Sequence, residues 1–300
     1  RGAVSGDATD EMLGALHDVL VRPMERAGLL SGVRRLIIVP HSFMTYLPFA
    51  ALRRSDSGRY LVQDYSILQA SSAGALAALR RTARASADAA GGARRSAGFA
   101  PFPDALPATP VELRAFRAAV RGAGGDAGSR ATESRLRAAL GTGGVVHVAT
   151  HGQMNPWNPM FSRIEMARGT GSAADDGRLE VHEILGLRVR ADLVFLSGCE
   201  TGLGPSWSTE FARGEDYASL AQAFLYAGAR TVISTLWPIA DDGGAEFATR
   251  FYAHLASEAP PEALAAAQRE MLAVRGRRVP YYWAAYQVSG DGESGALAHR

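Results

Sequence analysis

Short hydrophobic runs alternate with amphipathic stretches along most of this chain of 300 residues. Runs that are hydrophobic at almost every position are typical of strands buried on both faces. Stretches with hydrophobic residues three and four positions apart predict helices that cover such strands. The expected strands are 36–40, 60–70, 96–99, 145–151, 163–167, 193–197, 231–237 and 283–289. The expected helices are 7–30, 73–84, 111–120, 132–140, 181–185, 219–227, 244–257 and 261–274, with Thr109 as the cap of the helix at 111–120.

This alternation predicts an α/β fold in which a mostly parallel sheet is sandwiched by helices. Ligands of such sheets bind beyond the carboxyl ends of the strands. The length suits one large domain, so we expect a single domain over 1–300. An N-terminal part, about 1–130, would lead into a core at about 131–300. The chain begins with arginine, and we therefore expect a fragment of a longer protein.

Composition excludes several functional classes. The hydrophobic fraction of 47% and the charged fraction of 21% describe an ordinary soluble domain. The net charge of +2 comes from scattered basic residues, which argues against nucleic-acid binding. A single cysteine cannot form an internal disulfide, and no hydrophobic run has the length of a membrane span. We therefore expect a cytoplasmic protein without a membrane segment.

The chemistry that the sequence suggests lies where two of the buried runs stop. Cys199 follows the run at 193–197 and Gly198, and small neighbours there leave room for a substrate carbonyl. His151 ends the run at 145–151 and precedes Gly152, whose amide can approach a substrate. A lone cysteine is most often a small buried hydrophobe. Its position past a strand, matched by a histidine in the equivalent place, favours a thiol nucleophile with an imidazole base.

His147 lies four residues before His151, on the same face of the strand and about 13 Å away at strand rise. We interpret it as a core histidine with a satisfied hydrogen bond. One cysteine and two such separated histidines lack the spacing of zinc ligands, so we expect no metal and no cofactor.

Several motifs, in this order, resemble one family. They are Leu106-Pro-Ala-Thr-Pro-Val-Glu-Leu113, His147-Val-Ala-Thr-His151-Gly152, Leu196-Ser-Gly-Cys-Glu-Thr-Gly202, Gly214-Glu-Asp216 and Leu236-Trp-Pro-Ile-Ala-Asp241. The chain resembles a CHAT domain, a caspase-like peptidase family related to caspases and separase and often attached to tetratricopeptide repeats. The resemblance implies a caspase-like sheet with His151 as general base and Cys199 as nucleophile. It also implies an oxyanion hole formed by the amides of Gly152 and Cys199.

The residues that choose the substrate are less marked in the sequence. Asp216, Asp241 and Glu215 follow family motifs on loops expected to border the cleft, and an acidic pocket would select arginine or lysine. A basic pocket would instead select aspartate, and Arg163, Arg178 and Arg213 are its candidates. The plainer interpretation of each acidic residue is a solvated loop charge. We favour a basic substrate residue.

These observations predict a thiol protease that cleaves a partner protein after a basic residue, through an acyl-enzyme, in a bacterial-type signalling or defence pathway. Two alternatives remain open at this point. One is a catalytically silent caspase-like module that binds partners, and the other is a cysteine amidase or esterase for small molecules. A regulatory repeat domain or activator outside this chain is a further expectation from the resemblance.

Overall fold

The structure is a computed structural model that describes residues 6–89, 94–155, 157–170, 175–198 and 220–293. The strands are β1 (Arg35–Ile38), β2 (Ser66–Gln69), β3 (Ala97–Ala100), β4 (Gly124–Ala127), β5 (Val145–Ala149), β6 (Gly152–Gln153), β7 (Arg163–Glu165), β8 (Arg178–Glu180), β9 (Leu193–Ser197), β10 (Thr231–Thr235) and β11 (Tyr286–Gly290). The helices are α1 (Gly6–Leu20), α2 (Arg22–Arg26), α3 (Ala73–Ala89), α4 (Thr109–Ala119), α5 (Glu133–Leu140), α6 (Val181–Leu185), α7 (Leu220–Ala227), α8 (Asp241–Leu255) and α9 (Pro260–Ala273).

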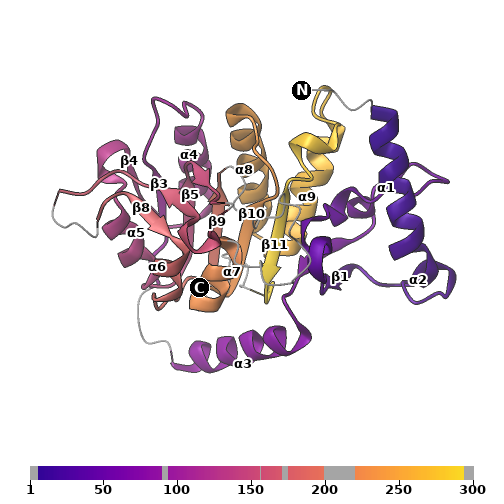
Figure 1. Ribbon diagram of the computed structural model, residues 1–300, viewed down its shortest axis with the longest axis horizontal. Coiled ribbons are helices and arrows are strands. Elements are labelled where there is room, and N and C mark those ends of the chain that lie inside the picture. Colours follow the sequence, from indigo (N-terminus) through magenta and orange to yellow (C-terminus); the bar gives the residue numbers. More distant parts are fainter. Residues whose placement is uncertain (1–5, 90–93, 156, 171–174, 199–219, 294–300) are drawn as a thin grey trace.

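Eight strands form one mostly parallel sheet in the order β1-β2-β11-β10-β9-β5-β3-β4. Each neighbouring pair is parallel except β10 and β11, which run antiparallel. Figure 1 shows α1, α2 and β1 at one end of the molecule and β4 at the other. A smaller antiparallel sheet, β6-β7-β8, follows β5 directly along the chain. The α/β class and the mostly parallel sheet predicted from the hydrophobic runs are confirmed.

Alternate residues of the central strands face two separate cores. Phe195 of β9 packs against Phe251 of α8, in a core that also contains residues of α4 and α9. Val194, its neighbour along the strand, belongs to a second core with Leu136 of α5 and Phe224 of α7. Successive strand side chains point to opposite faces, so α4, α8 and α9 cover one face of the sheet and α5, α6 and α7 cover the other.

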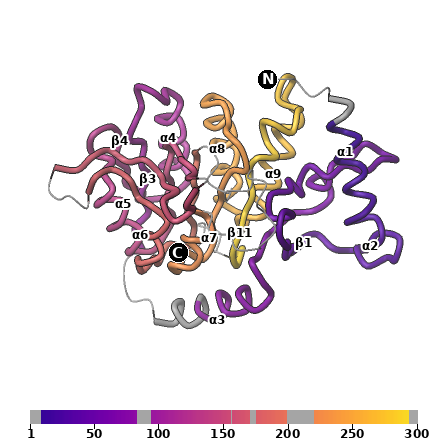
Figure 2. Tube along the Cα trace, viewed as in Figure 1, coloured from indigo at the N-terminus to yellow at the C-terminus, as the bar shows by residue number. Residues whose placement is uncertain are grey.

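The N-terminal strands join the rest of the sheet through the last strand of the chain. Figure 2 shows the indigo and purple trace of the N-terminal part on the right of the view, next to the yellow trace of α9 and β11. Arg35 of β1 donates two hydrogen bonds to Glu262 of α9, at 2.8 and 2.6 Å. Ser66 of β2 donates a third to the same carboxylate, at 2.7 Å. This polar contact connects the beginning of the chain to its C-terminal helix.

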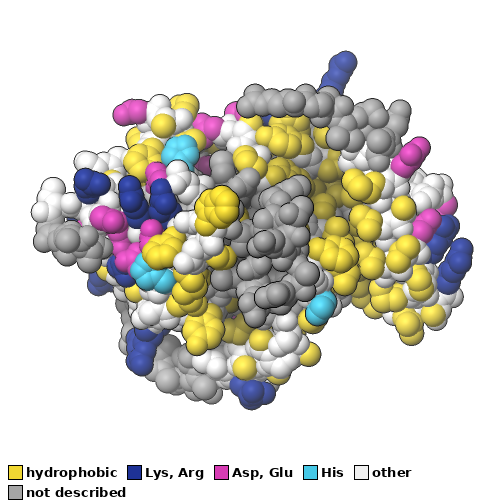
Figure 3. Space-filling model, viewed as in Figure 1, with side chains coloured by type: hydrophobic (Ala, Val, Ile, Leu, Met, Phe, Trp, Pro, Cys, Tyr) yellow, Lys and Arg dark blue, Asp and Glu magenta, His cyan; other side chains and the backbone are white. Residues whose placement is uncertain are grey.

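Several hydrophobic side chains remain exposed on the N-terminal elements. In Figure 3 such side chains gather on the right of the view, over this part of the molecule. The exposed ones from this region include Met12, Val19, Leu29, Ile37 and Phe43.

Among the described helices, none is both long and apolar enough to cross a membrane.

Two sequence predictions fail at element boundaries. The helix expected at 7–30 is two helices, because α1 ends at Leu20 and the short helix α2 begins at Arg22, with Pro23 in its first turn. Thr109 does not cap α4: Ala108 holds the cap position, and the Thr109 hydroxyl donates instead to the carbonyl of Leu106, at 2.8 Å. The strand β4 was not expected, since its Gly-Gly-Asp-Ala sequence has no hydrophobic run.

Candidate active site

The strands β5 and β9 end level with each other. Ala149 at the end of β5 is the register partner of Ser197 at the end of β9. One residue further, the Thr150 amide donates to the Ser197 carbonyl, at 3.0 Å. The chain therefore enters two loops at the same carboxyl edge of the sheet, and His151 stands in one while Gly198 stands in the other. This is where ligands of open α/β sheets bind.

His151 is held from two sides. Its backbone carbonyl accepts a hydrogen bond from the Glu165 amide of β7, at 2.9 Å. Its ring lies 5.8 Å from the ring of Phe102, centroid to centroid, at an interplanar angle of 32°. Phe102 belongs to the loop that follows β3, the next strand along from β5. The His151 side chain is thus half-buried and lies against an aromatic neighbour.

The Gly152 amide points away from the small sheet. Gly152 of β6 is the register partner of Ile164 of β7, and the flanking bond runs from Glu165 to His151. Gly152 and Ile164 are therefore a non-hydrogen-bonded pair of an antiparallel ladder. In such a pair the amide N–H of each residue points away from the partner strand. The Gly152 N–H is therefore not used in the ladder.

The loop after β9 is described only at its beginning. The Gly198 carbonyl accepts a hydrogen bond from the Thr235 hydroxyl of β10, which ties the end of β9 to its neighbour. Cys199, the predicted nucleophile, lies outside the described residues, as do Glu215, Asp216 and Arg213. The predicted oxyanion contribution of the Cys199 amide lies outside them for the same reason.

One cavity brings together residues from both loops and from the start of α8. It contains His151, Gly198 and Asp241. The other lining residues are Leu106, Thr109, Glu112, Thr150, Ser197, Ile239, Ala240, Gly244 and Tyr286. Asp241 is the first residue of α8, and its Oδ2 accepts a hydrogen bond from the Ala108 amide at the start of α4, at 2.7 Å. Of the three predicted acidic pocket residues, Asp241 is the described one, and it lies in the same cavity as His151.

Of the arginines of the alternative basic pocket, the two that the structure describes, Arg163 and Arg178, do not line this cavity. Arg163 donates to Gln153 and Glu165 on the small sheet. Arg178 belongs to β8 of that sheet and is exposed. Asp242, next to Asp241, turns to the surface and pairs with Arg277, whose hydrogen bond lowers the pKa of the Asp242 carboxyl. The ionisable side chains among the described lining residues are two carboxyl groups, a histidine and a tyrosine.

A buried polar cluster lies next to the cavity, and one of its members, His147, was predicted from the sequence. His147 is fully buried, and its Nδ1 lies 2.8 Å from the Tyr252 hydroxyl of α8, in agreement with the prediction of a core histidine with a hydrogen bond. Its Nε2 lies 3.3 Å from Oε2 of Glu112 on α4. Burial raises the pKa of Tyr252 well above its usual value, and the nearby Glu112 carboxylate raises it further.

Glu112 was missed as a functional candidate. Its signal in the sequence is an acidic residue one helical turn into a stretch that is otherwise predicted to cover a buried sheet. Tyr286 was missed as well, because it lies in the hydrophobic run of the last strand. Burial raises the pKa of Tyr286 well above its usual value, the Glu112 carboxylate raises it further, and a hydrogen bond with the Ser197 side chain opposes the shift.

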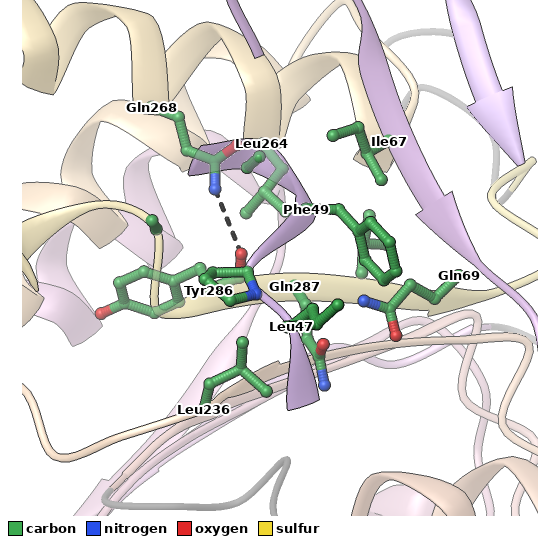
Figure 4. A pocket seen from close by; sticks show the side chains of 13 residues that line it. Leu47, Phe49, Ile67, Gln69, Leu236, Leu264, Gln268, Tyr286 and Gln287 are labelled. Atoms are coloured by element: carbon green, nitrogen blue, oxygen red, sulfur yellow. Dashed lines mark hydrogen bonds between the residues drawn. The ribbon is translucent and has the colours of Figure 1, made fainter. Parts of the chain in front are cut away.

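A second cavity lies on the other side of Tyr286, away from His151. Its lining comes mainly from the segment at 47–50, from β2 and β11 and from α9. Figure 4 shows Gln268 directed at the carbonyl of Tyr286, to which it donates at 3.1 Å, while the Tyr286 hydroxyl points away from Phe49 and Gln69. The described residues contain no group of three or more metal-ligating side chains.

Comparison with known proteins identifies the family to which the sequence belongs. The profile of the CHAT domain matches residues 10–291. Tetratricopeptide repeat protein 28 of Mus musculus and that of Homo sapiens are each 25% identical to the chain over 328 residues. The alignment covers 93% of this chain and 13% of each relative, so the chain spans a small share of their length.

Solved structures agree on the fold. Separase, in the Saccharomyces cerevisiae separase–securin complex, superposes with a TM-score of 0.61 at 15% identity, over 85% of this chain and 15% of that chain. Porphyromonas gingivalis RgpB, in a complex of its pro- and mature domains, gives 0.57 at 10% identity, over 99% of this chain and 70% of that chain. Both are caspase-like cysteine peptidases, and at these identities they show the fold alone. The family is shown by the profile match, which covers nearly the whole chain: the chain belongs to the CHAT domain family.

Proposed function

We propose that this chain is a cysteine endopeptidase that uses His151 and Cys199 as a catalytic dyad. The observation that carries the proposal is that β5 and β9 end side by side at the same edge of the sheet, because their last residues are register partners. It delivers His151 to one loop and Gly198, which directly precedes Cys199, to the neighbouring loop. Both loops border one cavity. A thiol and an imidazole that leave adjacent parallel strands at the same edge are suited to exchange a proton.

The reaction proceeds in two steps. His151 takes the proton of the Cys199 thiol, and the sulfur attacks the carbonyl carbon of a peptide bond. The C–N bond then breaks, and the departing amine receives its proton from His151. Water, activated by the same imidazole, hydrolyses the resulting thioester and releases the new carboxyl terminus.

Backbone amides would stabilise the negative oxygen formed in each step. Gly152 supports this role because its N–H points outward from the β6–β7 ladder, one residue after the proposed base. The Cys199 amide is the second proposed donor. Such preorganised donors typically contribute about 10²–10³ in rate.

We propose a basic residue before the cleaved bond. Asp241 supports it, because this carboxylate borders the cavity that contains His151. One structural neighbour is described as the Arg specific cysteine proteinase gingipain R, with a TM-score of 0.55 at 11% identity, over 99% of this chain and 69% of that chain. The proposed substrate is a protein, in a signalling or defence setting. Glu215 and Asp216 remain further proposed members of the pocket.

The test is cleavage of a fluorogenic peptide library by the parent protein, a Cys199→Ala variant and an Asp241→Asn variant. We expect turnover by the parent, none by Cys199→Ala, and a weaker preference for arginine and lysine in Asp241→Asn. The asparagine keeps an oxygen to accept from the Ala108 amide, so its effect reports the charge. Equal turnover by Cys199→Ala and the parent would contradict the proposal.

Thiol labelling separates the remaining alternatives. Rapid, pH-dependent labelling of Cys199 by a small electrophile is expected of an active dyad. An inert thiol together with no peptide turnover would favour a module that binds partners without cleaving them. Turnover of small esters without any peptide cleavage would favour a small-molecule hydrolase.

A further inference from the structure

The cavity beside His151 continues into a recess left open by a missing side chain. Gly244 lies in the first turn of α8 and is buried. A Cβ added there would lie 3.6 Å from the Tyr286 hydroxyl, 3.7 Å from Oε1 of Glu112 and 3.8 Å from Oγ of Ser197. Three polar atoms from α4, β9 and β11 therefore surround the space that a side chain at this position would fill.

Glu112 is the charged member of this recess. It is 2% exposed, and its Oε2 has no hydrogen-bond partner among the described residues. The one described residue within ion-pair distance of it is His147, whose Nε2 lies 3.3 Å away. A buried polar atom without a partner is costly, so a carboxyl group with such an atom beside a cavity is a candidate ligand contact.

His147 lies between Tyr252 and Glu112. The Tyr252 hydroxyl, 2.8 Å from Nδ1, donates its hydrogen to that nitrogen when the imidazole carries its proton on Nε2. In this arrangement Nε2–H faces Oε2 of Glu112, while Oε1 of Glu112 lies toward Gly244.

The described walls of the cavity contain no arginine or lysine side chain. Its ionisable side chains are Glu112, Asp241, His151 and Tyr286, which are two acids, a histidine and a phenol. Asp241 already accepts from the Ala108 amide, and Glu112 lies among the neutral polar atoms around Gly244. An elongated cation that enters beside His151 thus meets a first carboxylate from α8 and a second from α4.

We propose that the Gly244 recess, defined by Gly244, Glu112, Tyr286 and Ser197, is a guanidinium subsite. This proposal rests on the proposed function. In it, Glu112 binds the side chain of the substrate arginine that precedes the cleaved bond. Compared with lysine, arginine has the longer side chain and offers several N–H donors in a fixed plane. This arrangement suits a carboxylate flanked by a hydroxyl. Gly244 is needed because any side chain there occupies the space of the ligand.

The first experiment measures binding without turnover. The full chain carrying Cys199→Ala is titrated with n-butylguanidinium and with its neutral isostere n-butylurea. We expect the guanidinium to bind more tightly. Adding Glu112→Gln is expected to reduce the ratio of the two affinities about ten- to hundredfold, since hydrogen bonds to a charged group contribute about that much. An unchanged ratio in a folded Glu112→Gln protein overturns the proposal.

Gly244→Ala gives a second, independent measurement. Its Cβ makes ordinary contacts with Tyr286, Glu112 and Ser197, so the fold is expected to tolerate it. Binding of both probes is expected to fall at least tenfold. Gly243→Ala is the matched control, because its Cβ would contact Tyr282 and Ile239 at 3.5 and 3.7 Å, away from the three polar atoms. Equal losses in both alanine variants, or none in either, would refute the subsite even where Glu112→Gln fails to fold.

Cleavage of matched peptides distinguishes this proposal from the function on which it rests. Peptides with arginine or citrulline before the cleaved bond are compared in the active protein. Guanidinium binding without cleavage of any peptide would retain the subsite and remove the peptidase. Cleavage with an arginine preference that survives Glu112→Gln and Gly244→Ala would retain the peptidase and remove the subsite.

Discussion

Ala149 and Ser197 are register partners at the ends of two parallel strands, and the amide of the residue after Ala149 donates to the Ser197 carbonyl. The pairing fixes where the two loops leave the sheet. His151 lies two residues beyond Ala149, and Gly198 one residue beyond Ser197. Their common position is therefore a property of strand register, which hydrogen bonds and two buried cores hold in place.

Replacing His151 by alanine is expected to abolish the proposed peptide cleavage with little loss of stability, because the proposed role of this half-buried ring is to transfer a proton and not to pack in a core. We expect kcat to fall by about 10³ or more. The measurement is steady-state kinetics together with thermal unfolding. His182→Ala is the matched control, since this exposed histidine lies on α6 and contacts the Met160 carbonyl. Comparable losses in both variants would argue against the dyad.

Phe102→Ala tests whether the aromatic contact orients the base. Without the ring at 5.8 Å, the His151 imidazole gains rotational freedom, and we expect kcat to fall about tenfold or more with a smaller change in KM. Phe161 provides a comparison, because its ring packs on His182 at 5.4 Å, away from the cavity. Unchanged kcat in Phe102→Ala would show that His151 is oriented by other groups.

Tyr252→Phe is expected to destabilise the fold without changing its shape. The substitution removes the hydroxyl that lies 2.8 Å from Nδ1 of the buried His147 and leaves that nitrogen without its partner. An unsatisfied buried polar atom costs about 1–3 kcal/mol in the free energy of unfolding. Denaturant titration measures this difference, and a free energy within about 0.5 kcal/mol of the parent value would contradict the assigned hydrogen bond.

Glu262→Gln tests the contact between the N-terminal strands and α9. Burial of Glu262 raises its pKa, but hydrogen bonds from Arg35 and Ser66 outweigh burial, so that its pKa in the folded protein is lowered. Such a carboxylate stabilises the fold above its unfolded pKa, about 4.3, and this contribution is lost as pH falls through the lower folded value. The variant should therefore have a lower urea midpoint at pH 7, and the difference should shrink in acid.

The control for that series is Glu11→Gln, at an exposed position on α1. It is expected to follow the parent at every pH. A Glu262→Gln midpoint that stays below the parent value by the same amount at pH 7 and pH 3 would mean that packing, and not charge, explains the loss.

The hydrophobic pattern was sufficient to predict the buried strands and most helices. Runs such as 145–151 and 231–237 are hydrophobic on both faces, and this composition is stable only inside a covered sheet. The pattern failed for β4, whose pairing with β3 comes from backbone hydrogen bonds without hydrophobic side chains. It also failed for Thr109, because the competing partner of its hydroxyl, the Leu106 carbonyl, is set by a loop.

The sequence by itself determined the class of fold and the two loops to which chemistry was assigned, because both follow from local hydrophobic runs that stop at polar turns. Tertiary structure decided which distant residues share the cavity. Glu112 and Asp241 are separated by more than a hundred positions, yet both line it, and Asp242 beside Asp241 faces an arginine at the surface. Which residues of α4 and α8 line the cavity depends on the position of each residue around its helix and on the packing of α4 against α8. Together these determine which side of each helix faces the sheet edge.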